Sequence, residues 1–283
     1  MTRPLIALAL VALLLPSPTP AQFVEPDVEV IYSVDGENPG DNFGILPAVI
    51  GDIDGDGVLE FLVTAPGNDD LATDAGKAYL YDGASGTLIR SHAGSVAMVK
   101  IQRAAAAGDV DGDDVPDYAY AAWPDPATPH PGYVNVHSGA SGALLHTFTG
   151  ENDGDQYGFG LSYLTDLNGD GHDEVLVGAP YFDDAFTNQG RAYLYSGIDG
   201  SLLRTQDGDS TEANFGHAIG GIGDLDADGF DDYVVGSPEG NGPFPGRGHA
   251  YVFSGATGTE IPPAMKGNPT RGAIFGGWIP ACR

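Results

Sequence analysis

Short runs of β-branched and aromatic residues alternate along this chain with clusters of glycine, proline and aspartate. Residues 61–63, 175–177 and 233–235 are such runs, and these residue types favour strands. A second kind of segment alternates apolar and polar positions with a period of two. It opens with glycine in every copy, at 76–81, 132–136, 190–195 and 248–253. The pattern therefore predicts many short strands joined by turns.

Four aspartate-rich loops recur among these strands, and their first residues lie 57, 57 and 58 positions apart. Each loop places an oxygen-bearing side chain at positions 1, 3, 5 and 9, and position 7 would add its backbone carbonyl. The predicted metal ligands are Asp52, Asp54, Asp56, Val58, Glu60, Asp109, Asp111, Asp113, Val115, Asp117, Asp166, Asn168, Asp170, His172, Glu174, Asp224, Asp226, Asp228, Phe230 and Asp232. Converging carboxylates repel one another unless a cation lies between them, and an all-oxygen ligand set favours a hard ion. The loops thus predict up to four Ca²⁺ sites.

Two other interpretations of the loops are weaker. An EF-hand needs a glutamate at position 12 and flanking helices, whereas position 12 here is Val63, Tyr120, Val177 or Val235. Clusters of aspartate and glycine also form ordinary hairpin turns. Four copies in one register favour the metal loop over the plain turn.

The sequence around the loops repeats as well. An aromatic-Gly pair precedes three of them, at 43–44, 157–158 and 215–216, and a proline follows each one. A glycine turn then separates the alternating strand from a last short strand. Each repeat therefore predicts four strands without a helix, which is typical of the blades of an all-β fold, the β-propeller; a stacked solenoid is the alternative. The predicted repeats are 43–99, 100–156, 157–214 and 215–274, with a partial repeat at 275–283.

The Phe-Gly pair, the Asp-x-Asp-x-Asp-Gly-x-x-Asp loop and the Gly-Ala-Pro stop at 178–180 together resemble the FG-GAP repeats of the integrin α-chain propeller. The resemblance covers nearly the whole chain after its N-terminal segment. It implies that the loops bind calcium on one face of the propeller, and that the opposite face or its rim binds partners. The partner itself does not carry over, because it depends on surface loops that vary between relatives.

Repeat 2 departs from the pattern. Residues 100–103 stand where an aromatic-Gly pair belongs, so we expect its entry strand to pack differently. Its loop has Asp114 where glycine would ease the sharp turn, and Pro116 at position 8, which makes the loop at Asp109 the weakest expected calcium site. In the following loop, we expect the imidazole of His172 to point to solvent.

The two ends of the chain are out of phase with the repeats. A fifth repeat begins at 275–276, and residues 28–33 are typical of the outer strand of a preceding blade. The two parts could complete one blade together and close the ring. Alternatively, the sheet ends are open, and an open edge invites pairing with another chain.

The N-terminus is typical of a secretory signal peptide. Arg3 supplies the positive region, residues 5–15 the apolar stretch, and cleavage after Ala21 is expected. We therefore predict a signal peptide at 1–21 and a propeller domain at 22–283. A secreted, periplasmic or cell-surface location follows, with no membrane span in the mature chain; a retained N-terminal anchor is the alternative.

Composition narrows the function further. A formal charge of −29, from 40 acidic and 11 basic residues, makes nucleic acid and anionic membranes poor partners. Cys282 is the sole cysteine, so no disulfide framework is expected. The histidines show no HExxH spacing, and no G-x-S-x-G elbow is present. Acidic pairs could mimic a glycosidase dyad, but the calcium loops account for most of them. We expect no catalytic site.

Three classes of function remain. The favoured one is an exported, non-catalytic module for adhesion to, or interaction with, a protein or glycan. Variable loops on a constant scaffold would carry recognition, and they lie at 67–75, 125–131, 181–189 and 239–247. The second class is an exported enzyme that acts on polysaccharides, and the third is a structural fragment of a larger surface assembly.

Overall fold

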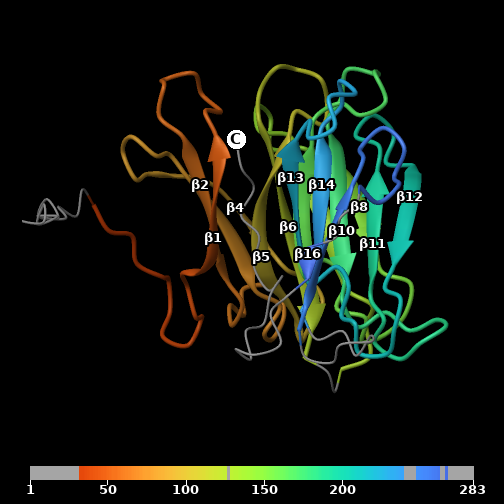
Figure 1. Cartoon of the computed structure of the whole chain (residues 1–283). Helices are drawn as coiled ribbons and strands as arrows, with labels where there is room; N and C mark the ends of the chain where they lie inside the picture. The colour runs from red at the N-terminus through yellow and green to blue at the C-terminus, as the bar shows by residue number, and fades with distance from the viewer. Residues whose placement is uncertain (1–31, 126–127, 239–246, 262–264, 267–283) are drawn as a thin grey trace, which may run out of the picture. The chain divides into compact units, whose positions relative to one another are not determined.

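The computed structural model of the chain describes residues 32–125, 128–238, 247–261 and 265–266. In these residues the chain forms sixteen β-strands and no helix, and all the strands lie in the unit that begins at Val34 (Figure 1). The expected signal peptide at 1–21, most of the expected outer strand at 28–33, the partial repeat at 275–283 and Cys282 lie outside the described residues.

The strands form four antiparallel sheets of four strands each, in which order along the chain is also order in space. Blade 1 contains β1 (Ile45–Gly51), β2 (Glu60–Ala65), β3 (Lys77–Tyr81) and β4 (Leu88–Ala93). Blade 2 contains β5 (Val99–Gly108), β6 (Asp117–Pro124), β7 (Tyr133–His137) and β8 (Leu144–Thr149). Blade 3 contains β9 (Gly160–Leu164), β10 (Glu174–Ala179), β11 (Arg191–Tyr195) and β12 (Leu202–Asp207). Blade 4 contains β13 (Ala218–Gly223), β14 (Asp232–Ser237), β15 (His249–Phe253) and β16 (Met265–Lys266). The all-β fold of β-propeller blades predicted from the sequence is confirmed.

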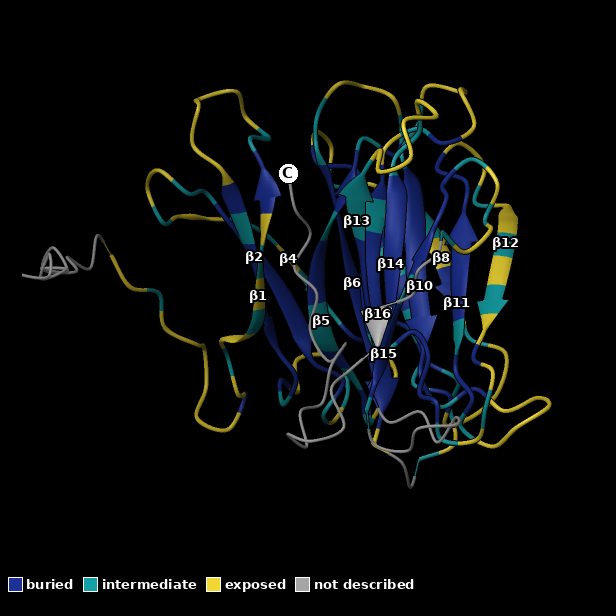
Figure 2. Cartoon of the chain, in the orientation of Figure 1, coloured by how far each residue is buried: buried dark blue, intermediate teal, exposed yellow. Residues whose placement is uncertain are grey.

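The core lies between the blades. The first strand of each blade packs against the first strand of the next, and a cluster of buried apolar side chains fills each of the three spaces between successive blades. The second and third strands are buried on both faces. The outer strand β12 of blade 3, by contrast, is made of exposed and half-buried positions (Figure 2). Between the four described blades, each facing pair of sheets is therefore buried against one another.

The alternation in the third strands follows from this packing. Successive side chains of a strand point to opposite faces of its sheet. In β11, Tyr193 and Tyr195 join the apolar cluster shared with blade 2, and Ala192 and Leu194 join the cluster shared with blade 4. Both faces are thus apolar, but each packs against a different blade.

The entry strand of repeat 2 does pack differently. β5 has ten residues, against seven in β1 and five in β9, and it carries two register irregularities. Ile101 occupies the place of the aromatic residue: its amide donates to Ala75 O at 3.0 Å, just as the amide of Phe215 donates to Gln189 O at 3.1 Å. An aliphatic side chain therefore fills the position that holds an aromatic ring in the other blades.

A basic side chain on the fourth strand of blades 1, 2 and 3 clamps each of these blades to the next. Arg90 donates from Nη1 to Gly139 O at 2.6 Å and from Nη2 to Ala140 O at 2.8 Å, in the turn between β7 and β8. His146 and Arg204 donate in the same way to the corresponding turns of blades 3 and 4. Because these partners lie about fifty residues apart in the sequence, no local pattern predicts them.

A pair of histidines, of which His137 is buried and His92 half-buried, lies between blades 1 and 2. The rings of His92 and His137 have centroids 4.0 Å apart, and His92 Nε2 lies 2.8 Å from the hydroxyl of Tyr118. Burial, reinforced by the charge of His137, lowers the pKa of His92 to about 4. Between blades 3 and 4 the equivalent position is Gln206, which donates to the hydroxyl of Tyr233.

Replacing Arg90 by alanine should lower the free energy of unfolding by about 1–3 kcal/mol, because two charge-assisted hydrogen bonds to backbone carbonyl groups are lost, one of them to the buried Gly139. Chemical denaturation of the wild type and the variant measures this difference. Lys100→Ala is the matched control, since its ion pair with Asp125 is exposed and should contribute less than about 1 kcal/mol. Equal effects of the two substitutions would contradict the clamp.

The free energy of unfolding should fall as the pH decreases from 6.5 toward 4. His92 stays neutral in the folded chain over this range, whereas it takes up a proton in the unfolded chain, so acid favours the unfolded state. His92→Gln keeps a donor to Tyr118, as Gln206 does for Tyr233, and should weaken this pH dependence. Urea unfolding at several pH values in saturating calcium tests the expectation, and an identical slope in the variant would refute it.

Candidate metal centres

The four aspartate loops lie at one end of the blades. Each connects the first strand of its blade to the second, and the loops extend from the upper end of the strands in Figure 1. Because all the sheets are antiparallel, the connections between the second and third strands lie at the opposite end. The candidate metal loops and the variable loops are therefore separated by the length of a strand.

Three carboxylates converge in every loop, with ligand atoms that all lie within 4.8 Å of one another. The loops that begin at 52, 109 and 224 bring together positions 1, 3 and 9. In the third loop Asn168 occupies position 3, and positions 1, 5 and 9 converge instead. The converging groups are Asp52, Asp54 and Glu60; Asp109, Asp111 and Asp117; Asp166, Asp170 and Glu174; and Asp224, Asp226 and Asp232.

The position-5 carboxylate also forms a hydrogen bond within its own loop. It accepts this bond from the amide of position 7, as in Asp56 with Val58 at 2.7 Å and Asp170 with His172 at 3.0 Å. The carboxylates of Asp56, Asp113 and Asp228 lie outside the converging groups. The carbonyl ligands predicted at Val58, Val115, His172 and Phe230 remain predictions.

Position 1 shapes the loop backbone around its own carboxylate. The two oxygens of Asp52 accept hydrogen bonds from the amides of Gly55 and Gly57 at 2.7 and 3.0 Å. These glycines have φ angles of +79° and +87°, in the left-handed region that side chains disfavour. Asp114 in the second loop and Ala227 in the fourth take up φ angles of +65° and +64° at glycine positions. The sequence interpretation identified the first of these departures and missed the second.

Position 9 is the deepest residue of each loop. Glu60, Asp117, Glu174 and Asp232 are all 0% exposed. The Oδ2 atom of Asp117 accepts from the amide of Val110 at 2.7 Å, and its Oδ1 accepts from the amide of Gly139 at 2.8 Å. A Cβ on Gly139 would lie 1.9 Å from Pro116 O, so only glycine allows this turn to approach the loop. One carboxylate thus ties the loop to the outer hairpin of its blade.

The residues present fit a hard divalent cation. Burial raises the pKa of Asp117 and of Glu174 to about 7, and it also raises the pKa of Glu60. Glu60 Oε1 and Asp111 Oδ1 are buried and accept no hydrogen bond. Buried oxygen atoms without donors, next to mutually repelling carboxylates, are what a calcium ion would satisfy.

The expectation that His172 points to solvent is wrong. Its Nδ1 donates to Val110 O at 2.9 Å, which joins the third loop to the second. The next residue, Asp173, accepts from the amide of Asp109 at 2.9 Å, and the corresponding Asp231 accepts from Thr165 at 2.6 Å. In the third and fourth loops, position 8 therefore connects the loop to the preceding blade. The sequence interpretation missed this role, because each partner belongs to the preceding blade.

Comparison with known proteins supports the repeats independently. A sequence model described as the FG-GAP repeat matches residues 43–81 and 162–195. Integrin alpha-5 of Xenopus laevis is 35% identical over 137 residues, which cover 45% of this chain and 13% of that protein. Integrin alpha-V of Gallus gallus is 32% identical over 167 residues, 56% of this chain and 16% of that protein. The matched region therefore spans less than a fifth of the length of either relative.

The fold was also compared with solved structures, and the described residues were searched for helices that could span a membrane. Sqt1 of Saccharomyces cerevisiae has 12% sequence identity and a TM-score of 0.49, over 77% of this chain and 47% of that one. Among the residues described here, no helix has the length and apolar character needed to span a bilayer. Residues 43–81 and 162–195 thus match the FG-GAP repeat, and about half of the chain is similar to integrin α chains.

Proposed function

We propose that this chain is an exported, calcium-binding propeller that acts as a non-catalytic module for binding a protein or glycan. The observation that carries the proposal is the recurrence of one three-carboxylate cluster at the same end of all four blades. A single cluster of this kind is common on an acidic chain. Four in one register, each with a fully buried member, favour a bound cation in every loop.

The ions would stabilise the fold. An ion that binds only the folded state contributes about 2.7 kcal/mol when its free concentration is 100-fold above its dissociation constant. Four such ions would contribute as much as the whole stability of a typical domain, roughly 5–15 kcal/mol. Removal of calcium should therefore loosen the end of the blades at which the loops meet.

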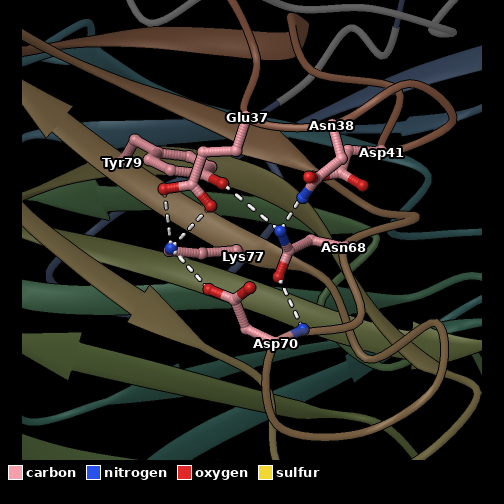
Figure 3. Close-up of polar contacts among 7 residues, drawn as sticks. All are labelled: Glu37, Asn38, Asp41, Asn68, Asp70, Lys77 and Tyr79. Atoms are coloured by element: carbon pink, nitrogen blue, oxygen red, sulfur yellow. Dashed lines mark hydrogen bonds and ion pairs between the residues drawn. The ribbon is translucent and has the colours of Figure 1, made fainter.

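A polar network anchors the connection between β2 and β3 at the opposite end of blade 1 (Figure 3). Lys77 is 8% exposed, and its Nζ donates to both oxygens of Glu37 at 2.9 Å and to Asp70 Oδ2 at 2.6 Å. Asn68 donates to Asp41 Oδ2 at 2.8 Å. These bonds tie the connection between β2 and β3 to the segment before β1. The part of the connection next to the strands is therefore held in place.

Blade 3 repeats this arrangement with different residues. The guanidinium of Arg191 pairs with Glu151 at 3.1 Å and with Asp207, and it lies 3.9 Å above the ring of Phe182. The tips of the two anchored connections expose Leu71 and Phe186, which are 69% and 44% accessible. Exposed apolar tips on a fixed base fit a surface for recognition of a macromolecule.

Binding to a partner should depend on these tips. We expect the labelled chain, in calcium, to bind a subset of a glycan array or of surface proteins from a neighbouring cell. The double variant Leu71→Ser and Phe186→Ser should lose that signal. Leu144→Ser, on the exposed outer strand β8, is the matched control. Equal binding by the double variant and the control would refute the assignment of these two tips as the recognition surface.

The chelator-stripped chain should bind close to four calcium ions in a calorimetric titration, because four loops hold the same cluster. Asp54→Asn should remove one ion and lower the melting temperature in calcium. Asp153→Asn removes an acidic group outside the clusters and should leave the stoichiometry unchanged. A count of three in the wild type, unaltered by Asp111→Asn, would identify the loop at Asp109 as the weak site. Absence of binding would contradict the proposal.

Calcium binding should release protons near neutral pH. Burial holds the pKa of Asp117 and Glu174 at about 7 in the ion-free chain, and only their ionised forms coordinate a cation. Affinity should therefore fall as the pH decreases below 7. Titrations in two buffers of different ionisation enthalpy measure the protons released. A binding enthalpy that is identical in both buffers would contradict this linkage.

A further inference from the structure

Blade 2 contains a pocket that the calcium loops and the anchored connections leave unexplained. It has a volume of about 290 Å³. Ala93, at the end of β4, and Ser95 form one side of it, and His130 and the strands β6, β7 and β8 form the other. It therefore opens between blades 1 and 2, at the end of the blades that carries the variable connections.

The pocket exists because blade 2 lacks an aromatic pair that the other blades have. In blade 3 the ring of Tyr157 packs edge-on against Tyr193 with centroids 5.3 Å apart, and blades 1 and 4 hold similar pairs at 5.4 and 5.5 Å. In blade 2, Ile101 takes the first place and Asn135 takes the second. Two rings are replaced by smaller side chains, which leaves room beside the strand.

Blade 2 also lacks the charged pair that blade 3 has at the equivalent position. Arg191 of blade 3 lies opposite Asp207 on the neighbouring strand and pairs with it. The equivalent residues of blade 2 are Tyr133 and Thr149, which face each other across β7 and β8. Of the described residues that line the pocket, none is a carboxylate, a lysine or an arginine. On a chain with a formal charge of −29, a lining of this kind favours a neutral ligand over an ion.

The polar groups of the pocket offer both donors and acceptors. Asn135 Nδ2 donates to the hydroxyl of Tyr120 at 3.0 Å, so that hydroxyl keeps its own proton to donate. Thr147 Oγ1 donates to Asn135 Oδ1 at 2.8 Å and keeps its lone pairs as acceptors. His130 Nδ1 accepts from the amide of Gly132 at 3.0 Å, which places the proton of the neutral imidazole on Nε2 as a further donor.

From this lining we infer that the pocket between blades 1 and 2 binds a neutral sugar ring, a pyranose presented by a glycan or as a free glycoside. A pyranose combines several hydroxyl groups, which need mixed donors and acceptors, with apolar C–H faces that pack on aromatic rings. Tyr133 and His130 supply such rings, with centroids 6.3 Å apart and planes at 72°. The inference rests on the proposed interaction function and names its ligand class, but it requires no change in the calcium loops.

The test is saturation-transfer NMR on the full chain in saturating calcium, with methyl glycosides of glucose, galactose and mannose as probes. We expect at least one of them to bind with a dissociation constant of about 1 mM, the weak range in which a single ring with few contacts falls. Asn135→Tyr restores the residue found in the other three blades, so it should fold and fill the pocket. Thr147→Val removes one acceptor on an exposed strand. Both variants should weaken binding by about tenfold or more.

Three results would overturn the inference. They are the absence of transfer from every neutral glycoside, unchanged binding in both variants, and tighter binding of glucuronic acid than of the glucoside. Asp153→Asn, at a different surface hollow, is the control that should leave sugar binding intact. Calcium stoichiometry is measured on the same samples. Normal calcium binding without sugar binding would refute this inference alone, whereas loss of calcium binding with sugar binding retained would refute only the calcium part of the proposed function.

Discussion

One fully buried carboxylate organises each blade, and the rest of the structure depends on it. The position-9 residue starts the second strand, accepts an amide from its own loop, and in blades 2 and 4 also accepts an amide from the outer hairpin. A lone buried negative charge costs several kcal/mol, so this arrangement is stable only if the charge is neutralised or shared. Without a cation, the converging aspartates would add repulsion between carboxylates to this cost. The same residues that define the repeat would thus be the ligands of the proposed ion.

The sequence predicted the repeat, the strand type and the place of the acidic loops, because each of these leaves a local, periodic trace. Hydrophobic alternation, glycine turns and the Asp spacing all lie within one repeat. Contacts between residues far apart in the sequence leave no such trace. The clamp of Arg90, the loop contact of His172 and the ion pair of Lys77 with Glu37 join residues 40–62 positions apart. The error at His172 came from treating its loop in isolation, although the neighbouring loop supplies the acceptor.

Blade 2 shows how the same framework tolerates a different interior. Its entry strand is longer, its aromatic pair is absent, and a tyrosine and threonine replace the charged pair of blade 3. The backbone pairing and the buried Asp117 are nevertheless retained. Main-chain hydrogen bonds and the position-9 carboxylate therefore define a blade, while the side chains at its variable end are free to differ. Similarity to a known repeat consequently predicts the fold of this chain, but it does not predict its ligand.

The forward direction of the clamp has an evolutionary consequence. In the described blades, the fourth strands of blades 1, 2 and 3 bind the turn of the following blade, and Asp173 and Asp231 at position 8 bind the preceding loop. The clamps at these three junctions are thus built from equivalent positions. Duplication or deletion of one whole repeat in the gene places equivalent blades next to each other. Each clamping side chain then still has a turn of the following blade as its hydrogen-bond acceptor. Changes in blade number along this lineage should then occur in steps of one complete repeat of about 57 residues.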